Sequence, residues 1–335
     1  MTIQGKAGDN AGDLAQAVLA GKAISREEAL CLLELTGDDR YDLFYWANRI
    51  RQERAGQAIS LCCIASARTG RCSEDCRFCA QSGHYQTTME SRQMSLQELQ
   101  AAAESARKIG AHSFGIVSSG YGPTEKELDR LEEVFQCISQ MGNLQCCASL
   151  GCLNEQQARR LRAMGVQRCH HNLETSRRFF PQIVSTHSYE ERLATIQAAK
   201  TAGMEVCSGG IFGMGEKLED RVDLAFTLRE LDVDCVPINF LNPIPATPLE
   251  TAEPLPPLAA LQIIAMFRFV LPDKQIEVAG GREKCLRDLQ SWVFHAGASR
   301  CMVGNYLTTA GRNLADDFQM LQDLELPLLN RENHS

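Results

Sequence analysis

Eight β-rich segments alternate with longer amphipathic segments along most of this 335-residue chain. The β-rich segments are residues 58–66, 113–120, 144–151, 167–174, 205–213, 235–242, 275–281 and 299–305. Between them lie stretches such as SLQELQAAAESARKIG and SYEERLATIQAAKTAG, which have apolar residues at helical spacing and end in glycine, a common helix terminator. Alternating strands and helices predict a parallel α/β sheet, and the count of eight favours a closed (β/α)8 TIM-type barrel over an open, doubly wound sheet.

The regions that flank the barrel are expected to differ from it. We predict a disordered tail over residues 1–12, a helical extension over 13–56, the barrel over 57–325 and a flexible tail over 326–335. The stretch SREEALCLLELT supports the extension, because Ser25 can cap a helix whose first turn is acidic. A hydrophobic content of 44% is enough for a sizeable core.

Composition excludes several classes of protein. A net charge of −8 argues against a nucleic-acid binder, which needs a basic face. No apolar run approaches the ~18 residues of a membrane span, and the N-terminus lacks the basic-then-apolar order of a signal peptide. We therefore expect a cytoplasmic protein. Disulfides are rare in a reducing compartment, so some of the fifteen cysteines are expected to bind metal.

Three cysteines lie close together in TGRCSEDCRFCAQSGHYQT, residues 69–87. Cys72, Cys76 and Cys79 follow the first predicted strand, at the end of a barrel where catalytic residues gather. Three thiolates would leave one iron of a [4Fe–4S] cluster open to a small molecule. The alternatives are a zinc site completed by His84 and a CxxC redox pair with one additional cysteine.

The pattern C-x3-C-x-aromatic-C, with Phe78 before Cys79, resembles the radical S-adenosylmethionine (SAM) superfamily. That resemblance implies an open iron that binds the amino and carboxylate groups of SAM. Reductive cleavage then gives methionine and a 5′-deoxyadenosyl radical, which abstracts hydrogen from unactivated carbon.

A wider set of motifs, in order between residues 60 and 309, resembles the biotin synthase family. These are CSEDCRFCAQSGHYQT, CHHNLETS, YEERLATI, VCSGGIFGMGE, VPINFLNPIPATPLE, AGGRE and GNYLTT. The resemblance implies a radical SAM sulfurtransferase of biotin biosynthesis, which inserts sulfur from an auxiliary iron–sulfur cluster into dethiobiotin. It also implies an electron-donating flavodoxin or ferredoxin and a homodimer.

Two other readings stay open. The first is another radical SAM enzyme of the same branch, such as a hydrogenase-cofactor maturase or a methylornithine synthase. The second is a non-catalytic iron–sulfur electron carrier, which would have no use for the SAM-pocket residues Asn172, Glu174 and Arg192 and would not cleave SAM.

The resemblance assigns the first cluster to Cys72, Cys76 and Cys79. Asn172 and Glu174 match the positions that hold the SAM ribose. Arg192 matches the residue that pairs with the SAM carboxylate, which suits the fork of a guanidinium. The other implied SAM contacts are Phe78, Ser118 and Ile211.

For dethiobiotin, the matched positions are His170, Asn172, Asn239, Thr308 and Thr309. A ureido ring presents N–H donors and a carbonyl acceptor, which asparagine and threonine side chains complement. His170 stands where the family pattern has asparagine, and histidine can still form hydrogen bonds. The adjacent His171 has the opposite strand parity, so it is expected to be packed away.

The auxiliary cluster is where the chain departs from the family pattern of three cysteines and one arginine around a [2Fe–2S] cluster. The resemblance assigns Cys147, Cys207 and the arginine Arg282 of AGGRE. The first cysteine should stand where the chain has Gly115, and glycine cannot ligate iron.

Strand parity offers replacements, because residues i and i+2 share a face. If Asn239 faces the interior, then Cys235 does too, about 13 Å deeper along the strand. If Ser66 faces inward, so does Cys62.

We therefore expect an auxiliary cluster held by Cys62, Cys147, Cys207 and Cys235. Four thiolates favour a four-iron cluster over [2Fe–2S], with Arg282 as a donor to the sulfides or a residual ligand. The alternative is that all four are ordinary buried cysteines. Cys285 is a reserve candidate, and two further cysteines have the wrong parity, namely Cys63 and Cys146.

Overall fold

The structure, a computed structural model, describes residues 11–305 and 311–329. Most of the two predicted tails, residues 1–10 and 330–335, lies outside this part of the chain, as do the substrate-site candidates Thr308 and Thr309.

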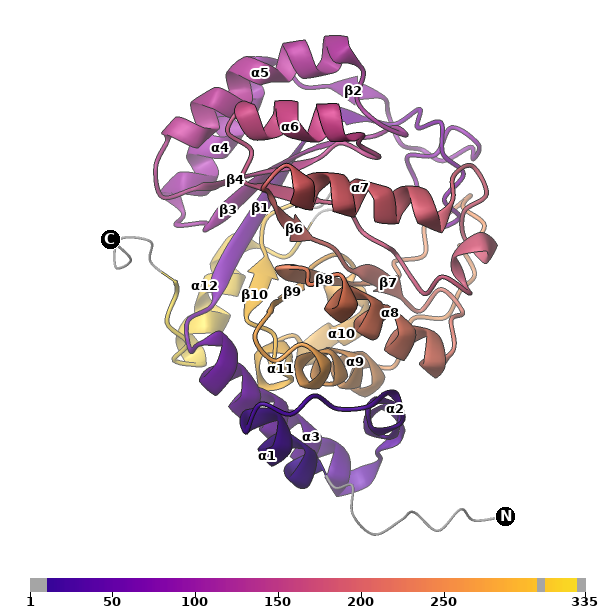
Figure 1. Ribbon diagram of the computed structural model, residues 1–335, viewed down its shortest axis with the longest axis vertical. Coiled ribbons are helices and arrows are strands. Elements are labelled where there is room, and N and C mark those ends of the chain that lie inside the picture. The colour runs from indigo at the N-terminus through magenta and orange to yellow at the C-terminus, as the bar shows by residue number, and fades with distance from the viewer. Residues whose placement is uncertain (1–10, 306–310, 330–335) are drawn as a thin grey trace.

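The described residues form a closed parallel barrel with eight strand positions, ringed by helices (Figure 1). Its strands are β1 Ser60–Thr69, β3 Ser113–Ser118, β4 Gln145–Ser149, β5 Arg168–His170, β6 Glu205–Cys207, β7 Gly210–Phe212, β8 Cys235–Phe240, β9 Gln275–Val278 and β10 Arg300–Met302. Strands β6 and β7 share one position, since both pair with β8. The pairing of β10 with β1 closes the barrel. The predicted fold class is confirmed, and every predicted strand is present.

Strand β1 is longer than the sequence indicated. It runs past Ser66 to Thr69, with a register shift between Ser66 and Arg68 in its pairing with β3. Its last residues pair antiparallel with β2, Arg92–Gln93. The three-cysteine loop therefore starts at Gly70 and still lies at the carboxyl end of the barrel strands.

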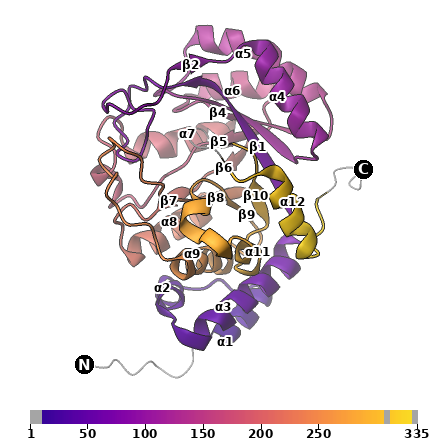
Figure 2. The ribbon, with the colours of Figure 1, turned by 180° about the vertical axis from the view of Figure 1, so that it is seen from behind.

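The outer helices are α4 Leu96–Lys108, α5 Glu125–Gln140, α6 Glu155–Ala163, α7 Tyr189–Thr201, α8 Leu218–Glu230 and α9 Pro257–Val270. After β9 come the short helices α10 Arg282–Leu286 and α11 Trp292–His295, and the last helix of the described residues is α12 Leu314–Asp323, which lies beside β1 (Figure 2). Side chains accept backbone N–H groups at several N-termini, for example Ser95, Asn154 and Ser188 in capping boxes. None of the helices in the described residues is long and apolar enough to cross a membrane.

The N-terminal helices are α1 Ala11–Leu19, α2 Arg26–Glu34 and α3 Gly37–Ile50, and the last continues into a π-helical turn, Arg51–Ala55. As predicted, Ser25 caps α2, in a capping box with Glu28. Ala11 and Gly12 were expected in the tail but begin α1, because its buried residues pack against α3. Helices α2 and α3 pack against α9, at one end of the molecule (Figure 1).

Residues 327–329 are hydrogen-bonded to Ile59, just before β1. Ile59 donates its N–H to the carbonyl of Pro327 at 2.8 Å, and Leu329 donates to the carbonyl of Ile59 at 2.9 Å. Residues 327–329, which the sequence assigned to a flexible tail, thus extend the hydrogen bonding just before β1.

A buried arginine links the end of α9 to β9 and β10. Arg268 is 0% exposed. Its guanidinium donates to the carbonyls of Gly297, Leu271, Pro272 and Lys274 and to Ser299 Oγ, at 2.8–3.2 Å. One side chain thus satisfies carbonyls in two connections that lead into the barrel.

Replacing this arginine tests its role in stability. We expect Arg268→Leu to lower the free energy of unfolding by at least about 3 kcal/mol, because several buried carbonyls lose their donor. Urea denaturation measures the change. The matched control is Arg159→Leu at an exposed position of α6, since the ion pair of Arg159 with Glu155 should contribute less than about 0.5 kcal/mol. Equal losses in both variants would contradict this account.

Candidate active site

A cavity of about 270 Å³ occupies the barrel interior. Its wall in the cluster loop includes Phe78, Cys79 and Gln81. Deeper along the strands it is lined by Cys62, Cys147, Cys207, Arg168, Glu277 and Arg300. The three-cysteine loop and the interior cysteines, far apart in sequence, therefore face one continuous space.

The three-cysteine loop folds back on itself. Cys72 donates its N–H to the carbonyl of Gln81 at 2.9 Å, and its own carbonyl accepts from Gly83 at 2.8 Å. Burial raises the pKa of Cys79 to about 11, while hydrogen bonds from the N–H groups of Gln81 and Ser82 oppose this shift. Burial also raises the pKa of Cys76, and the Arg192 guanidinium opposes it. The loop thus supplies N–H donors and α7 supplies a positive charge, and both favour bound thiolates.

The proposed zinc ligand His84 is engaged elsewhere. Its Nε2 lies 2.9 Å from the carbonyl oxygen of Ser73, within the loop backbone. Among the described side chains, no three His, Cys, Asp or Glu residues converge on a position for a single metal ion.

Asn172, Glu174 and Arg192 lie together. Asn172 Nδ2 is 3.4 Å from Glu174 Oε2, and Arg192 Nη1 is 3.6 Å from Glu174 Oε1. Burial raises the pKa of Glu174, and the Arg192 charge opposes the shift. Arg192 is therefore not a solvated surface arginine, since only 8% of it is exposed.

The two glycines that follow Ser208 allow this arrangement. The chain at Gly210 bridges to Glu174, and a Cβ added at Gly210 would lie 2.4 Å from the Glu174 carbonyl oxygen. Glu174 itself has a φ of 68°, in the left-handed region. A close backbone approach thus fixes where the Glu174 carboxylate points.

Of the remaining candidates for SAM contact, two line the cavity and one does not. Ile211 and Phe78 line the cavity, whereas on β3 the lining residues are Gly115 and Val117 and not Ser118. Ser118 Oγ is buried without a hydrogen-bond partner in the described structure.

Two described candidates for substrate contact, besides Asn172, line the cavity. His170 Nδ1 lies 3.4 Å from Cys207 Sγ, and burial lowers the His170 pKa, which favours neutral imidazole. Asn239 accepts from the N–H of Gly280 at 2.9 Å and donates to the Gly210 carbonyl at 3.3 Å, so its amide orientation is fixed. His171 is buried but absent from the cavity wall, in line with its parity.

Three of the four cysteines assigned to the auxiliary cluster line the cavity, whereas Cys235 is buried and does not. Cys62, Cys147 and Cys207 line the cavity. Cys235 lies opposite Cys207 in the β6–β8 pairing, and a hydrogen bond between the two thiols, with burial, raises the pKa of Cys207. The cysteines of opposite parity, Cys63 and Cys146, instead join the apolar core together with Cys169, Cys285 and Cys301.

Gly115 also lines the cavity, beside these thiols. A Cβ added there would lie 3.7 Å from Cys147 Cβ and 3.3 Å from Ile64 Cγ2. The position is thus next to the cysteine group, and the Ile64 side chain crowds the space that a larger residue at 115 would need.

The prediction for Arg282 needs correction. Arg282 begins α10, right after Gly281 at a φ of 80°, and does not line the cavity. Its guanidinium pairs with Asp317 at 2.6 Å and with Gln290 at 2.9 Å. The reserve candidate Cys285 also points elsewhere, toward the Leu255 carbonyl at 3.5 Å.

The guanidiniums that face the thiols belong to Arg168 and Arg300, which sequence reasoning missed. Burial raises the pKa of Cys147, and both arginines oppose this shift. Arg300 Nε lies 2.5 Å from Glu277 Oε2, whereas Arg168 Nη1 is buried without a hydrogen-bond partner in the described structure. The signal was available, because Arg168 is two residues before the inward-facing His170 on β5.

Comparison with known proteins gives two matching family models. The Radical SAM superfamily matches residues 66–228, and the Biotin and Thiamin Synthesis associated domain matches residues 237–327. The chain is 51% identical to a biotin synthase from Heliobacterium modesticaldum, over 94% of this chain and 97% of the relative. It is 48% identical to a biotin synthase from Geotalea uraniireducens, over 93% and 96%.

Solved structures with a similar fold include methylornithine synthase PylB, with a TM-score of 0.84 and 19% identity over 96% of this chain and 98% of that one. Another is the hydrogenase maturase HydG from Carboxydothermus hydrogenoformans, with a TM-score of 0.79 and 19% identity over 94% of this chain and 78% of that one. These likenesses concern the fold alone. The sequence identities and both family models show that the chain belongs to the biotin synthase family of radical SAM enzymes.

Proposed function

We propose that this chain makes biotin from dethiobiotin with two iron–sulfur clusters, one at each end of a single cavity. The observation that carries the proposal is the cavity wall, which includes Cys79 of the cluster loop and, deeper in the barrel, Cys62, Cys147 and Cys207. When bound, the first cluster and SAM supply hydrogen abstraction, and the auxiliary cluster supplies sulfur.

The first cluster is assigned to Cys72, Cys76 and Cys79. Backbone N–H donors at Cys79 and the guanidinium near Cys76 support thiolate ligands there. Arg192 and Glu174 would then hold SAM, the first by its carboxylate and the second by its ribose hydroxyls. Both side chains are buried close to the loop, which excludes water from the charged groups.

The middle of the cavity is assigned to dethiobiotin. Asn172 and Asn239 present amide groups, and the neutral His170 adds a ring nitrogen. Backbone contacts to both asparagines orient these groups before a ureido ring arrives. Thr308 and Thr309 are kept as substrate contacts on the family resemblance.

The auxiliary cluster is assigned to Cys62, Cys147, Cys207 and Cys235, with four irons favoured over two. The unpartnered Nη1 of Arg168 supports an anionic group among these thiols, because a buried N–H donor without an acceptor is costly. Arg168 and Arg300 take the place that the sequence assigned to Arg282. An electron-donating flavodoxin or ferredoxin and a homodimer complete the proposal.

The other enzymes of the branch share the fold, so product analysis separates them. Incubation with dethiobiotin, SAM and a reductant should yield biotin and 5′-deoxyadenosine. Release of 5′-deoxyadenosine without biotin would favour a maturase or methylornithine-synthase activity. No cleavage of SAM at all would favour an electron carrier.

Glutamine at position 174 tests the SAM pocket. We expect Glu174→Gln to weaken SAM binding about tenfold, because an amide offers one acceptor oxygen to two ribose hydroxyls. Equilibrium dialysis with the anaerobically reconstituted protein measures the change. Glu190→Gln is the control, since Glu190 is exposed at the start of α7 and pairs with Arg177. Unchanged binding by Glu174→Gln would contradict the assignment.

Iron content tests the auxiliary site. Reconstituted protein should hold about eight irons, against about six for a [4Fe–4S] and [2Fe–2S] pair. Cys62→Ser and Cys235→Ser should each lose iron, down to about four if the second cluster fails to assemble. The controls Cys63→Ser and Cys146→Ser change buried thiols of opposite parity on β1 and β4. Equal iron loss in the controls, or only four irons in the unaltered protein, would refute the assignment.

The charge of Arg168 provides a separate test. Arg168→Met should lower the reduction potential of the auxiliary cluster, because a positive charge near the thiols stabilises the more negative, reduced state. Arg168→Lys keeps the charge and should retain most of the potential. Redox titration followed by electron paramagnetic resonance measures both. Identical potentials in all three proteins would exclude this role.

A further inference from the structure

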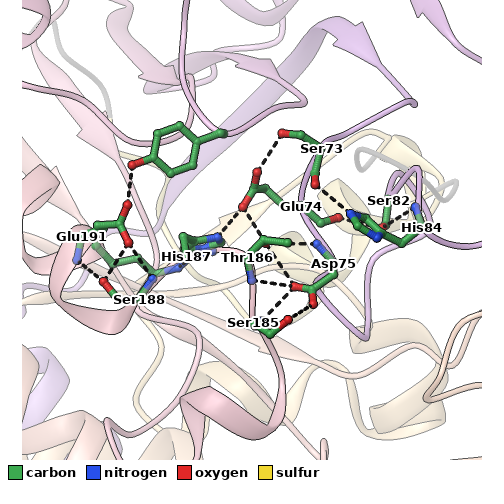
Figure 3. Close-up of polar contacts among 12 residues, drawn as sticks. Ser73, Glu74, Asp75, Ser82, His84, Ser185, Thr186, His187, Ser188 and Glu191 are labelled. Atoms are coloured by element: carbon green, nitrogen blue, oxygen red, sulfur yellow. Dashed lines mark hydrogen bonds and ion pairs between the residues drawn. The ribbon is translucent and has the colours of Figure 1, made fainter.

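A network of polar side chains outside the cavity joins the cluster loop to the segment that leads into α7 (Figure 3). Glu74 and Asp75 lie between Cys72 and Cys76 and reach across to Ser185, Thr186 and His187. These contacts join two segments that are more than 100 residues apart in sequence, and the residues that make them do not line the cavity.

Asp75 anchors the loop. Its carboxylate accepts the N–H groups of Ser185 and Thr186, at 2.9 and 3.2 Å, and the hydroxyl group of Ser185. These bonds hold the pKa of Asp75 at about 2 in spite of partial burial. The carboxylate thus fixes the loop to the segment before α7.

Glu74 makes a second and more directed contact. Its Oε2 lies 2.6 Å from His187 Nδ1 and accepts the Thr186 hydroxyl at 2.7 Å, while Oε1 accepts the Ser73 hydroxyl at 2.7 Å. Glu74 is 7% exposed and His187 8%. The carboxylate is therefore committed to contacts within the protein.

His187 contacts Glu74 through one ring nitrogen and Arg192 through the other. Arg192 Nε lies 3.1 Å from His187 Nε2. Because arginine can only donate, Nε2 must be the acceptor, so the proton sits on Nδ1 and is donated to Glu74. Burial and the Arg192 charge lower the pKa of His187, in keeping with a neutral ring.

These contacts decide which part of Arg192 is available. Nε is held by His187, and Nη1 donates to the Asn172 carbonyl at 2.8 Å. In the described part of the chain, Nη2 makes no hydrogen bond. The guanidinium also lies over the Phe180 ring, with its carbon 5.4 Å from the ring centre. Two nitrogens and one face are thus fixed, and Nη2 remains for a ligand.

We infer that Glu74 and His187 are positioning residues that orient Arg192 toward the SAM carboxylate, so that the cluster loop itself sets the geometry of SAM binding. The inference rests on the proposed function of Arg192. It adds that Glu74, one of the three residues between the first two cluster cysteines, acts through a histidine rather than on the cluster.

Substitution of His187 separates orientation from packing. The imidazole packs edge-on against Phe180 and Tyr121, with ring centres 5.7 and 6.2 Å away. His187→Phe keeps an aromatic ring there and removes both hydrogen bonds. His187→Gln restores an acceptor for Arg192 Nε. Tyr121→Phe is the matched control, since it removes only a hydrogen bond to Glu191 at the half-exposed edge of the same group.

Each protein is reconstituted anaerobically, its iron is counted, and its dissociation constant for SAM is measured by equilibrium dialysis. We expect about tenfold weaker SAM binding for His187→Phe, the loss of one charge-assisted hydrogen bond, and recovery to within about threefold for His187→Gln. Tyr121→Phe should match the unaltered protein. Iron content should be the same in all four.

Unchanged SAM binding by His187→Phe would overturn the inference. So would loss of iron from His187→Phe, because the network would then hold the cluster loop rather than orient Arg192. Failure of the proposed function has a different signature. The unaltered protein would hold its cluster without binding SAM, which would overturn the role of Arg192 and the inference with it.

Discussion

The buried charge pair between Arg300 and Glu277 is the contact on which the interior of this barrel depends. Arg300 stands on β10, the strand that closes the barrel onto β1, and its guanidinium also reaches Ser60 on β1 and Ser113 on β3. One buried side chain thus connects four strands. Arg168 on β5 connects three strands in a similar way, through Glu205 on β6 and Gln275 on β9. Buried charges are tolerated only when paired, so these polar contacts select one register of the strands.

The thiols lie against this charged layer. Cys62 and Cys147 interact electrostatically with both Arg300 and Glu277. Cys207 and Cys235 lie opposite each other on neighbouring strands. Arginine favours bound thiolates, while the carboxylate of Glu277 limits the positive charge. The cavity above this layer leads to the cluster loop, where Arg192 and Glu174 repeat the pattern of one cation and one anion beside cysteines. Charged side chains at both ends of the cavity suit the proposed binding of one anionic cluster at each end.

Much of this could be predicted from the sequence. The alternation of β-rich and amphipathic segments was enough for the barrel, and period-2 parity separated Cys62 and Cys147 from their neighbours Cys63 and Cys146. Parity works because inward and outward positions alternate strictly along a strand. Parity could not be applied to Arg282, since that residue follows the strand and starts a helix, where the period changes. The resemblance had placed it by motif, without a strand to support the placement.

Long-range contacts between loops could not be predicted from the sequence. Nothing local to Glu74 indicates His187, because their meeting depends on how two loops cross at the end of the barrel. The start of α1 at Ala11 and the docking of residues 327–329 on Ile59 were missed for the same reason, since each is stabilised by a partner far away in the chain. Contacts with distant parts of the chain, and not local sequence signals, decided the structure of these segments.

The central claim is that the barrel holds a second cluster on four cysteines, and Mössbauer spectroscopy of protein reconstituted with iron-57 tests it most directly. The account predicts two sets of [4Fe–4S] signals with comparable total areas, one of which changes when SAM binds to the open iron. A spectrum in which all iron belongs to a single SAM-responsive [4Fe–4S] cluster would contradict it.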